Sequence, residues 1–409
     1  MNTELAIVNE PLSVLAVLLG VLASLFALQR TALGQRLYRV VPVLLFCYFI
    51  PTLLSNTGII PSNSNHPLYH FITQWLLPAS LFLLILAVDI PAILGLGRNV
   101  LVLFATAFVS IILAGPLAFF ILSGLFDAEH AEQVWRGLSA LSGSWIGGGA
   151  NMTAIKESVA ASDDILAAIV VVDVFVAEIW TAVLFYFAGR ELRMDARISA
   201  DRTALDAVRK KAEAYRAQID RPTDLTSLLI MLALAFGATA ASEKASGWLV
   251  EAIPPNDVFG AFTWKVVLIT GLGLAASFTR AQQLEGAGAS SVGSVFLFLL
   301  VASIGAKANF LSVLRPENLP LVAVGALWMV LHVSAMLLVR RWIRAPIFFA
   351  AIGSRACIGG AASAPIVAAA FNPALVPVGV MLAILGYVVG TLGGVVCAFL
   401  MRHVYLIVY

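Results

Sequence analysis

Long apolar runs alternate with short polar segments along the whole chain. A helix needs about 20 apolar residues to cross the hydrocarbon core of a bilayer, and twelve segments meet that measure. Six lie before a polar stretch, at 12–29, 38–55, 69–88, 99–123, 137–158 and 164–188, and six after it, at 224–246, 258–279, 288–314, 318–340, 346–370 and 373–401. This pattern predicts an all-α polytopic membrane protein.

The fifth segment of each half is interrupted by glycines. The first interruption is Gly147-Gly148-Gly149, within the polar run Ser142–Thr153, and the second is Gly359-Gly360, within Ser354–Pro365. Glycine is costly inside a helix, and lipid tolerates an interrupted helix only where its freed backbone groups line an enclosed cavity. Two interrupted segments at matching places in two halves indicate the binding site of a transporter.

The two halves are joined by the longest hydrophilic stretch of the chain. We therefore predict a first membrane repeat at 1–188, a polar cytoplasmic linker at 189–223 and a second membrane repeat at 224–409. Within the linker, residues 199–219 could form a surface helix. Asp224, which closes the linker, is a candidate cap for the next helix.

Basic residues in the short loops give conflicting orientations for the two halves. They place the linker and the C-terminus in the cytoplasm, but the first half starts outside and the second half starts inside. Opposite orientations are typical of inverted repeats. Six crossings per half would instead return the chain to its starting side, so the sequence leaves the number of spans between about 11 and 13.

Composition excludes several classes of protein. The chain is 61% hydrophobic and 12% charged, whereas a soluble domain is roughly 25% charged. The net charge of +2 comes without a basic patch, so no nucleic-acid partner is expected. The three cysteines lie in apolar runs without a metal-ligand spacing, and neither a nucleophile elbow nor a Walker motif is present. We expect no enzyme activity and no cofactor.

Polar groups around the two interruptions are the first candidates for binding. Half-helix ends carry partial charges, positive at the N-terminus and negative at the C-terminus. Together with the backbone of Gly147, Gly148, Gly149, Gly359 and Gly360, side-chain oxygens would come from Ser142, Ser144, Asn151, Thr153, Ser354 and Ser363. The alternative is that the interruptions are packing kinks between closely spaced helices.

Two acidic residues, Asp173 and Glu178, lie in the apolar sixth segment. A charge at the bilayer centre costs roughly 3 kcal/mol on insertion scales, and such residues usually mark ion paths. Asp173, near the middle, is the candidate coupling carboxylate, and Glu178 lies about 140° around the helix. The alternative is a structural ion pair with Lys156, Arg355 or Lys307. Arg355 could neutralise either acid or bind a substrate carboxylate.

Three further features favour a structural explanation. His332 stands alone in an apolar segment, as packing histidines do. Gly386, Gly390 and Gly394 recur every four residues, which is typical of a stripe where helices pack closely. Asp89, before Ile90 and Pro91, reads as a helix end near the membrane interface.

Three motifs carry a resemblance to a known family: Ser142–Thr153, the run from Leu77-Pro78-Ala79 to Asp89, and Ala302-Ser303-Ile304-Gly305-Ala306. Nearly the whole chain resembles the domain-of-unknown-function 819 family of integral membrane proteins, grouped with the cation–proton antiporter and anion transporter superfamily. The resemblance implies a panel or dimerisation domain, a core domain with two crossing broken helices, and elevator-type movement. In sodium–proton antiporters of that superfamily, an acidic motif occupies the helix that matches the one carrying Asp173.

Together these observations predict an ion-coupled secondary transporter in the inner (plasma) membrane. Its substrate would be a small organic solute, for which an anion such as a carboxylate is one possibility. Sodium or protons would be the coupling ion, and the resemblance implies a homodimer. Three alternatives remain open: a sodium–proton antiporter without an organic substrate, a membrane receptor or scaffold that binds a ligand without flux, and a channel.

Overall fold

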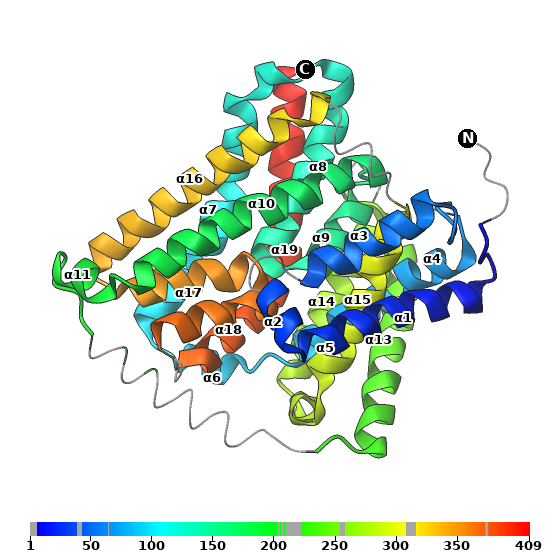
Figure 1. The fold of residues 1–409 in the computed structure, drawn as a ribbon, viewed down its shortest axis with the longest axis horizontal. Helices are drawn as coiled ribbons and strands as arrows, with labels where there is room; N and C mark the ends of the chain where they lie inside the picture. Colours follow the sequence, from blue (N-terminus) through cyan, green and yellow to red (C-terminus); the bar gives the residue numbers. More distant parts are fainter. Residues whose placement is uncertain are drawn as a thin grey trace.

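The computed structural model describes residues 6–38, 43–63, 65–202, 205, 208, 222–253, 258–307, 316–372 and 375–409. Regular structure within these ranges is entirely helical (Figure 1). Eight of the described helices are long and apolar enough to cross a membrane, and a ninth is gained if the bent pair Ala261–Ser277 and Arg280–Ala287 is counted as one span. The predicted all-α polytopic fold is confirmed.

Each of the twelve predicted segments contains a helix. The first half comprises α1 (Pro11–Gln29), α2 (Ala32–Leu37), α3 (Val43–Asn56), α4 (Pro67–Phe71), the π-helical turn η1 (Ile72–Leu76), α5 (Leu77–Leu86), α6 (Ile90–Leu94), α7 (Arg98–Ile121), η2 (Ser123–Leu125), α8 (Ala128–Gly147), α9 (Gly149–Ser158), α10 (Asp163–Ala188) and α11 (Glu191–Ala196). The second comprises α13 (Leu225–Ala252), α14 (Ala261–Ser277), η3 (Arg280–Ala287), α15 (Ala289–Lys307), η5 (Pro316–Asn318), α16 (Pro320–Ile343), α17 (Ile347–Cys357), α18 (Gly360–Phe371) and α19 (Val376–Val408). Most of the surface helix suggested at 199–219 lies outside the described residues.

Side-chain caps fix where several helices begin. Asp224 accepts a hydrogen bond from the backbone N–H of Ser227 at 2.9 Å, as predicted for the start of α13. Asp89 accepts one from Ala92 at the start of α6, which confirms its reading as a helix end. Each cap satisfies an N–H group that has no partner within the helix.

The helices pack into two groups that draw on both halves of the chain. The α5 group contains α1, α3, α4–α5, α13, α14 and α15, and the α19 group contains α7–α10 and α16–α19. Figure 1 shows the α5 group on the right and most of the α19 group on the left. The first three segments of each half thus join one group, and the last three join the other.

The first interrupted segment folds back on itself. A Cβ atom on Gly143 would lie 2.7 Å from the carbonyl oxygen of Asn151, although these residues would be about 12 Å apart in a continuous helix. Farther from the turn, the N–H of Ser162 donates to Oε1 of Gln133 at 3.0 Å. Gly148 makes the turn with a φ of +79°, which glycine adopts without strain. Helices α8 and α9 therefore form a hairpin whose two ends lie on the same side.

The second interrupted segment is also a hairpin. The rings of Phe348, at the start of α17, and Phe371, at the end of α18, have centroids 5.6 Å apart. The turn lies at Gly359 and Gly360, with φ of +104° and +57°. Both predicted interruptions are therefore present, but each produces a re-entrant hairpin where we expected an interrupted span that crosses its counterpart.

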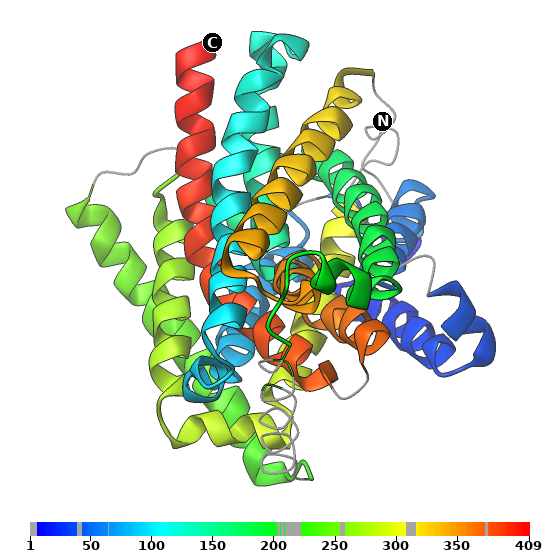
Figure 2. The ribbon, with the colours of Figure 1, turned by 90° about the vertical axis from the view of Figure 1, so that its left-hand side faces the viewer.

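The two hairpins approach α19 from opposite ends and meet near its middle. At one end, Trp135 of α8 lies 6.5 Å from Tyr405, centroid to centroid. At the other, a Cβ atom on Gly379 would lie 3.0 Å from the carbonyl oxygen of Ala364 in α18. Figure 2 shows α19, in red, running upright beside α7, which shares its direction. A hairpin returns the chain to the side it entered from, so five other segments remain in each half. This odd number lets the two halves start on opposite sides, but it also puts the linker and the C-terminus at opposite ends of the crossing helices. The expectation that both lie in the cytoplasm is therefore inconsistent with the hairpins.

The tips of the hairpins meet at Gly386 of α19. A Cβ atom there would lie 3.0 Å from the carbonyl oxygen of Ile146 and 3.3 Å from that of Ala356. The predicted small-residue stripe continues at Gly390, where a Cβ atom would lie 2.6 Å from Cα of Gly147, and at Gly394. The stripe therefore packs α19 against the first hairpin.

Replacing Gly390 by alanine should destabilise the protein, because the added methyl group would overlap the backbone of Gly147. Overpacking of this kind costs about 1–3 kcal/mol, and we expect a lower midpoint of thermal unfolding in detergent. Gly271→Ala in α14 is the control, since a Cβ atom there meets nothing within 4 Å. Equal midpoints for the two variants would contradict the close packing of α19 on the first hairpin.

The hairpin geometry predicts which sites share a side of the membrane. Single cysteines at Glu129 and Ala160, exposed positions at the two ends of the first hairpin, should react with an impermeant maleimide from the same side of the membrane. A cysteine at Arg341, near the base of the second hairpin, should react from the other. The natural cysteines are all buried, which limits background labelling. Labelling of the first two positions from opposite sides would show that this segment spans the bilayer.

Candidate functional site

The place where the two tips meet concentrates backbone carbonyl groups. Helices α8 and α17 both end there, with the carbonyl oxygens of Ile146 and Ala356 beside Gly386. The last carbonyls of a helix lack partners within that helix and carry its negative partial charge. Two converging C-terminal ends make this junction attractive to a cation.

Asp173 of α10 is attached to the first tip by both carboxylate oxygens. The hydroxyl of Ser144 donates to Oδ2 at 2.6 Å, and Nε1 of Trp145 donates to Oδ1 at 2.8 Å. The three basic side chains suggested as its partners are paired with other acids within the described residues. The carboxylate therefore lies next to the carbonyl-rich junction and is held by neutral donors.

Glu178 and Arg355 form an ion pair at the second tip. Nη2 of Arg355 lies 3.2 Å from Oε1 of Glu178, and Nη1 donates to the carbonyl oxygen of Ala177 at 3.2 Å. The guanidinium residue is 3% exposed, whereas 30% of the Glu178 side chain is exposed. Among the described residues, the structural ion pair that we considered for the two acids is therefore present for Glu178 and not for Asp173.

Helix α10 connects the two hairpins. Besides its contacts through Asp173 and Glu178, Nε1 of Trp180 donates to the hydroxyl of Ser354 at 2.8 Å. The same hydroxyl lies 2.8 Å from Nε2 of His332, whose Nδ1 lies 2.7 Å from the hydroxyl of Ser110. His332 is thus a buried packing residue with both ring nitrogens satisfied, as predicted, and Ser354 belongs to a polar network behind the tip.

Asn151 closes the turn of the first hairpin. Its Nδ2 donates to the carbonyl oxygens of Gly147 at 3.0 Å and Tyr387 at 3.3 Å, and its Oδ1 accepts from the hydroxyl of Thr391 at 2.6 Å. Thr391 in turn accepts from Thr270 of α14 at 3.1 Å. This predicted site residue therefore holds the turn against α19 and reaches the α5 group.

Other predicted residues divide between the two tips. Ser142 and Thr153 donate to carbonyl oxygens of their own hairpin, those of Ser139 and Gly149. They lie near the junction without a free donor. The hydroxyl of Ser363 is buried and makes no hydrogen bond with the described residues. The structure thus brings the predicted residues together but leaves unsatisfied groups on the second tip.

Two tryptophans, Trp145 and Trp180, are functional candidates that sequence reasoning missed. Each donates its indole N–H to a residue that we did predict. Trp145 lies inside the polar run of the first interruption, and Trp180 lies seven residues, about two helical turns, after Asp173. A buried tryptophan usually finds an acceptor for its N–H, so their positions beside predicted polar residues were a usable signal.

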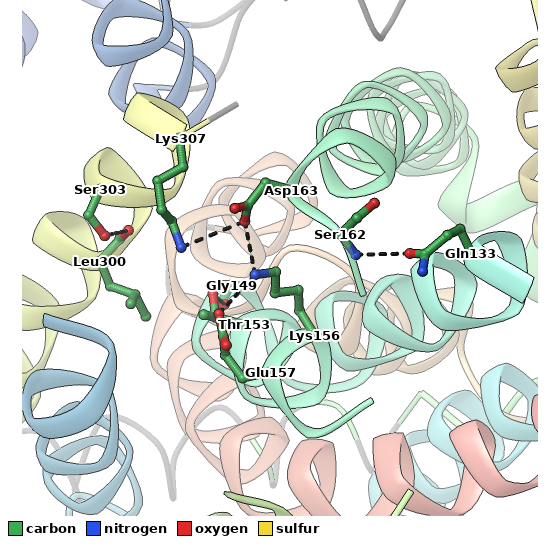
Figure 3. A network of polar contacts seen from close by, with 10 residues as sticks. All are labelled: Gln133, Gly149, Thr153, Lys156, Glu157, Ser162, Asp163, Leu300, Ser303 and Lys307. Carbon is green, nitrogen blue, oxygen red and sulfur yellow. Dashed lines mark hydrogen bonds and ion pairs between the residues drawn. The ribbon is translucent and has the colours of Figure 1, made fainter. Parts of the chain in front are cut away.

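A charged cluster links the two groups of helices at the base of the first hairpin (Figure 3). Oδ1 of Asp163, at the start of α10, lies 2.9 Å from Nζ of Lys156 in α9 and 3.6 Å from Nζ of Lys307 at the end of α15. Lys156 also pairs with Glu157 at 2.9 Å. The side chains of the two lysines are 8% and 6% exposed. Asp163 therefore bridges the α19 group and the α5 group through buried charges.

Replacing Asp163 by asparagine should lower the midpoint of thermal unfolding, because two buried ammonium groups would lose an anion. Breaking a buried pair by removing one partner costs about 3–5 kcal/mol. The double variant Asp163→Asn/Lys307→Met should recover part of the loss. Glu132→Gln, which removes the more exposed pair with Arg136, is the control and should change little. A double variant no more stable than Asp163→Asn would show that Lys307 is not coupled to Asp163.

The chain also resembles known proteins over most of its length. The family model described as "Protein of unknown function (DUF819)" matches residues 15–404. The uncharacterized membrane protein YjcL of Bacillus subtilis (strain 168) is 22% identical over 353 residues, which cover 84% of this chain and 85% of that protein. The resemblance noted from the sequence motifs is therefore confirmed, and this polytopic membrane protein belongs to the DUF819 family.

Proposed function

We propose that the protein is an ion-coupled secondary transporter of a small organic solute, with the coupling cation bound at Asp173. The observation that carries this proposal is the meeting of two re-entrant tips beside Asp173. In transporters, discontinuous helices place their ends near the middle of the bilayer to bind substrates and ions. An acidic side chain within a membrane segment is a candidate functional site by default.

The division into two groups of helices supports alternating access of the elevator type. Both tips and α10 belong to the α19 group, so a bound solute would move with that group as a unit. The α5 group contacts it through a limited set of contacts, among them Thr270 with Thr391 and Lys307 with Asp163. In this proposal, those contacts break and re-form as the α19 group moves along the α5 group.

The remaining parts of the proposal concern the setting of the protein. The basic residues Arg340 and Arg341 in the last turn of α16, together with Arg344, support a linker in the cytoplasm and a place for the protein in the plasma membrane. With five crossings between the linker and the C-terminus, this proposal puts the C-terminus on the other side of the membrane, whereas the sequence led us to expect it in the cytoplasm. Exposed apolar side chains on the α5 group, such as Leu229 and Trp248, would face lipid or a second subunit of a homodimer. No chemical conversion and no bound cofactor form part of the proposal.

A sodium–proton antiporter is the second candidate. Asp173 favours it, because a carboxylate held only by neutral donors is free to exchange a proton for a cation. The solute transporter is preferred because the second tip carries polar groups that a simple exchange of two cations would not need.

Thermal stability of purified protein provides the test. A solute that binds the folded state raises its stability, by about 2.7 kcal/mol at a hundredfold excess over the dissociation constant. We expect a solute to stabilise the wild type only when sodium is present or the pH is low, and Asp173→Asn to remove that dependence. Glu129→Gln, an exposed acid in α8, is the control and should behave like the wild type.

The other outcomes separate the alternatives. If sodium or pH shifts the stability and no solute does, cation-dependent proton flux in vesicles would identify the antiporter. Binding of a solute without flux in vesicles would favour a receptor or scaffold, and single-channel currents would favour a channel. If Asp173→Asn responds as the wild type does throughout, Asp173 is not the coupling residue.

A further inference from the structure

The two hairpin tips differ in how far their polar groups are satisfied. At the first tip, the side chains of Ser144, Trp145 and Asn151 all have hydrogen-bond partners. At the second, Nε of Arg355 and the hydroxyl of Ser363 are buried and make no hydrogen bond with the described residues. Buried polar groups are nearly always paired, so two unpaired groups at one turn point to a ligand.

Both unpaired groups lie close to the turn at Gly359. A Cβ atom on Gly359 would lie 2.3 Å from Oγ of Ser363 and 3.1 Å from Cζ of Arg355. The guanidinium and the hydroxyl therefore converge on the same point of the backbone, and this close approach requires glycine. The turn leads directly into α18, a helix of 12 residues.

The start of α18 adds backbone donors to this point. Gly359 occupies the cap position and has no side chain, so it provides no side-chain cap for the first N–H groups of the helix. Free N–H groups and the positive end of the helix dipole favour an anion there. The second tip thus combines a cationic side chain, a hydroxyl and a helix N-terminus. Each of these three groups can donate a hydrogen bond to an anion.

We infer that the transported solute carries a carboxylate, which binds at the second tip between Arg355, Ser363 and the start of α18. This inference rests on the proposed function and names the substrate class of the same site. Guanidinium groups bind carboxylates in a two-pronged geometry. The backbone N–H groups of α18 and the hydroxyl of Ser363 supply further donors to the same anionic group.

In the present structure, the carboxylate of Glu178 contacts the guanidinium to which the solute carboxylate would bind. Its Oε1 lies 3.2 Å from Nη2 of Arg355, and 30% of its side chain is exposed, so the side chain has room to turn away. The incoming solute would exchange one carboxylate for another at Arg355. Among the described residues near the tips, the two acids Asp173 and Glu178 accompany one guanidinium, that of Arg355. A further anion would add to this excess of negative charge, so its entry is favoured when a cation enters with it. The coupling would then be symport.

Pairs of carboxylates and their neutral amides test the inference. Succinate and succinamide, propionate and propionamide, and inorganic phosphate would each be added to purified protein in sodium, with thermal unfolding as the readout. A carboxylate should raise the midpoint, and its amide should not. Phosphate serves as a second oxyanion, and a stabilising effect confined to phosphate would overturn the assignment to a carboxylate.

Variants locate the site. Ser363→Ala removes a hydroxyl that makes no hydrogen bond with the described residues, so folding should be unaffected. A hydrogen bond to a charged group is worth roughly 1.5–3 kcal/mol, so Ser363→Ala should raise the carboxylate concentration for half-maximal stabilisation about tenfold or more. Arg355→Gln should abolish the stabilisation, and Arg355→Lys should retain part of it. The control is Ser139→Ala, a buried serine of α8 that donates to Trp135 and should leave the response unchanged.

The remaining outcomes distinguish failure of the carboxylate inference from failure of the transporter proposal. If carboxylates stabilise Ser363→Ala and Arg355→Gln as well as the wild type, the anion binds elsewhere and the inference is wrong. If an amide or another neutral solute stabilises the protein and is carried into vesicles, the transporter proposal stands and the carboxylate inference falls. If no solute, charged or neutral, stabilises the wild type or crosses vesicles, both proposals fall.

Discussion

The structure depends on close contact between helix backbones at the middle of α19. Gly386 and Gly390 let the turn of the first hairpin approach, and Gly386 also admits the end of α17. Without a hydrophobic driving force between helices in lipid, small residues that permit close packing are the main source of association. The same contact shields the freed carbonyl groups of two helix ends from hydrocarbon, where each unsatisfied group would cost several kcal/mol. The glycine stripe is therefore what makes a pair of interrupted segments tolerable in a membrane.

Helix α10 converts this packing into a site. Its carboxylate at Asp173 is bound to the first tip, and its residues Ala177, Glu178 and Trp180 are bound to the second. A change in the charge of Asp173 therefore acts on a helix that also contacts Arg355. This physical connection would let binding at one tip alter binding at the other, as the proposed coupled transport requires. The connection is local, because the contacts on the second tip begin only four residues, about one helical turn, after Asp173.

Much of the fold followed from hydropathy, because lipid imposes length and composition on any helix it surrounds. All twelve helical segments, the two glycine interruptions and the cap at Asp224 were predicted. The hairpins were not. A segment of the length of 137–158 fits a crossing helix as well as two short arms, and α8 begins earlier, at Ala128, within a polar stretch that hydropathy rejects. The arms pack against α19 and so do not need an apolar surface. In the site, the types of residue were predictable, but the choice of Glu178 over Asp173 as partner of Arg355 depends on how deep each hairpin reaches, which only tertiary packing sets.

The conflict over orientation was itself informative. The basic residues indicated opposite orientations of the two halves, while the count of apolar segments indicated the same orientation. The opposite orientations hold once the interrupted segments enter and leave on one side, since the remaining five segments of each half invert the chain. The same five crossings separate the linker from the C-terminus, so the two do not share a side. The two tips approach α19 from its opposite ends with unlike chemistry. One binds an acid through neutral donors, and the other carries an arginine and a serine with donors that no described residue satisfies. Related positions in the two halves therefore need not share a ligand, and this asymmetry suits a carrier that binds a cation and an anion at neighbouring points.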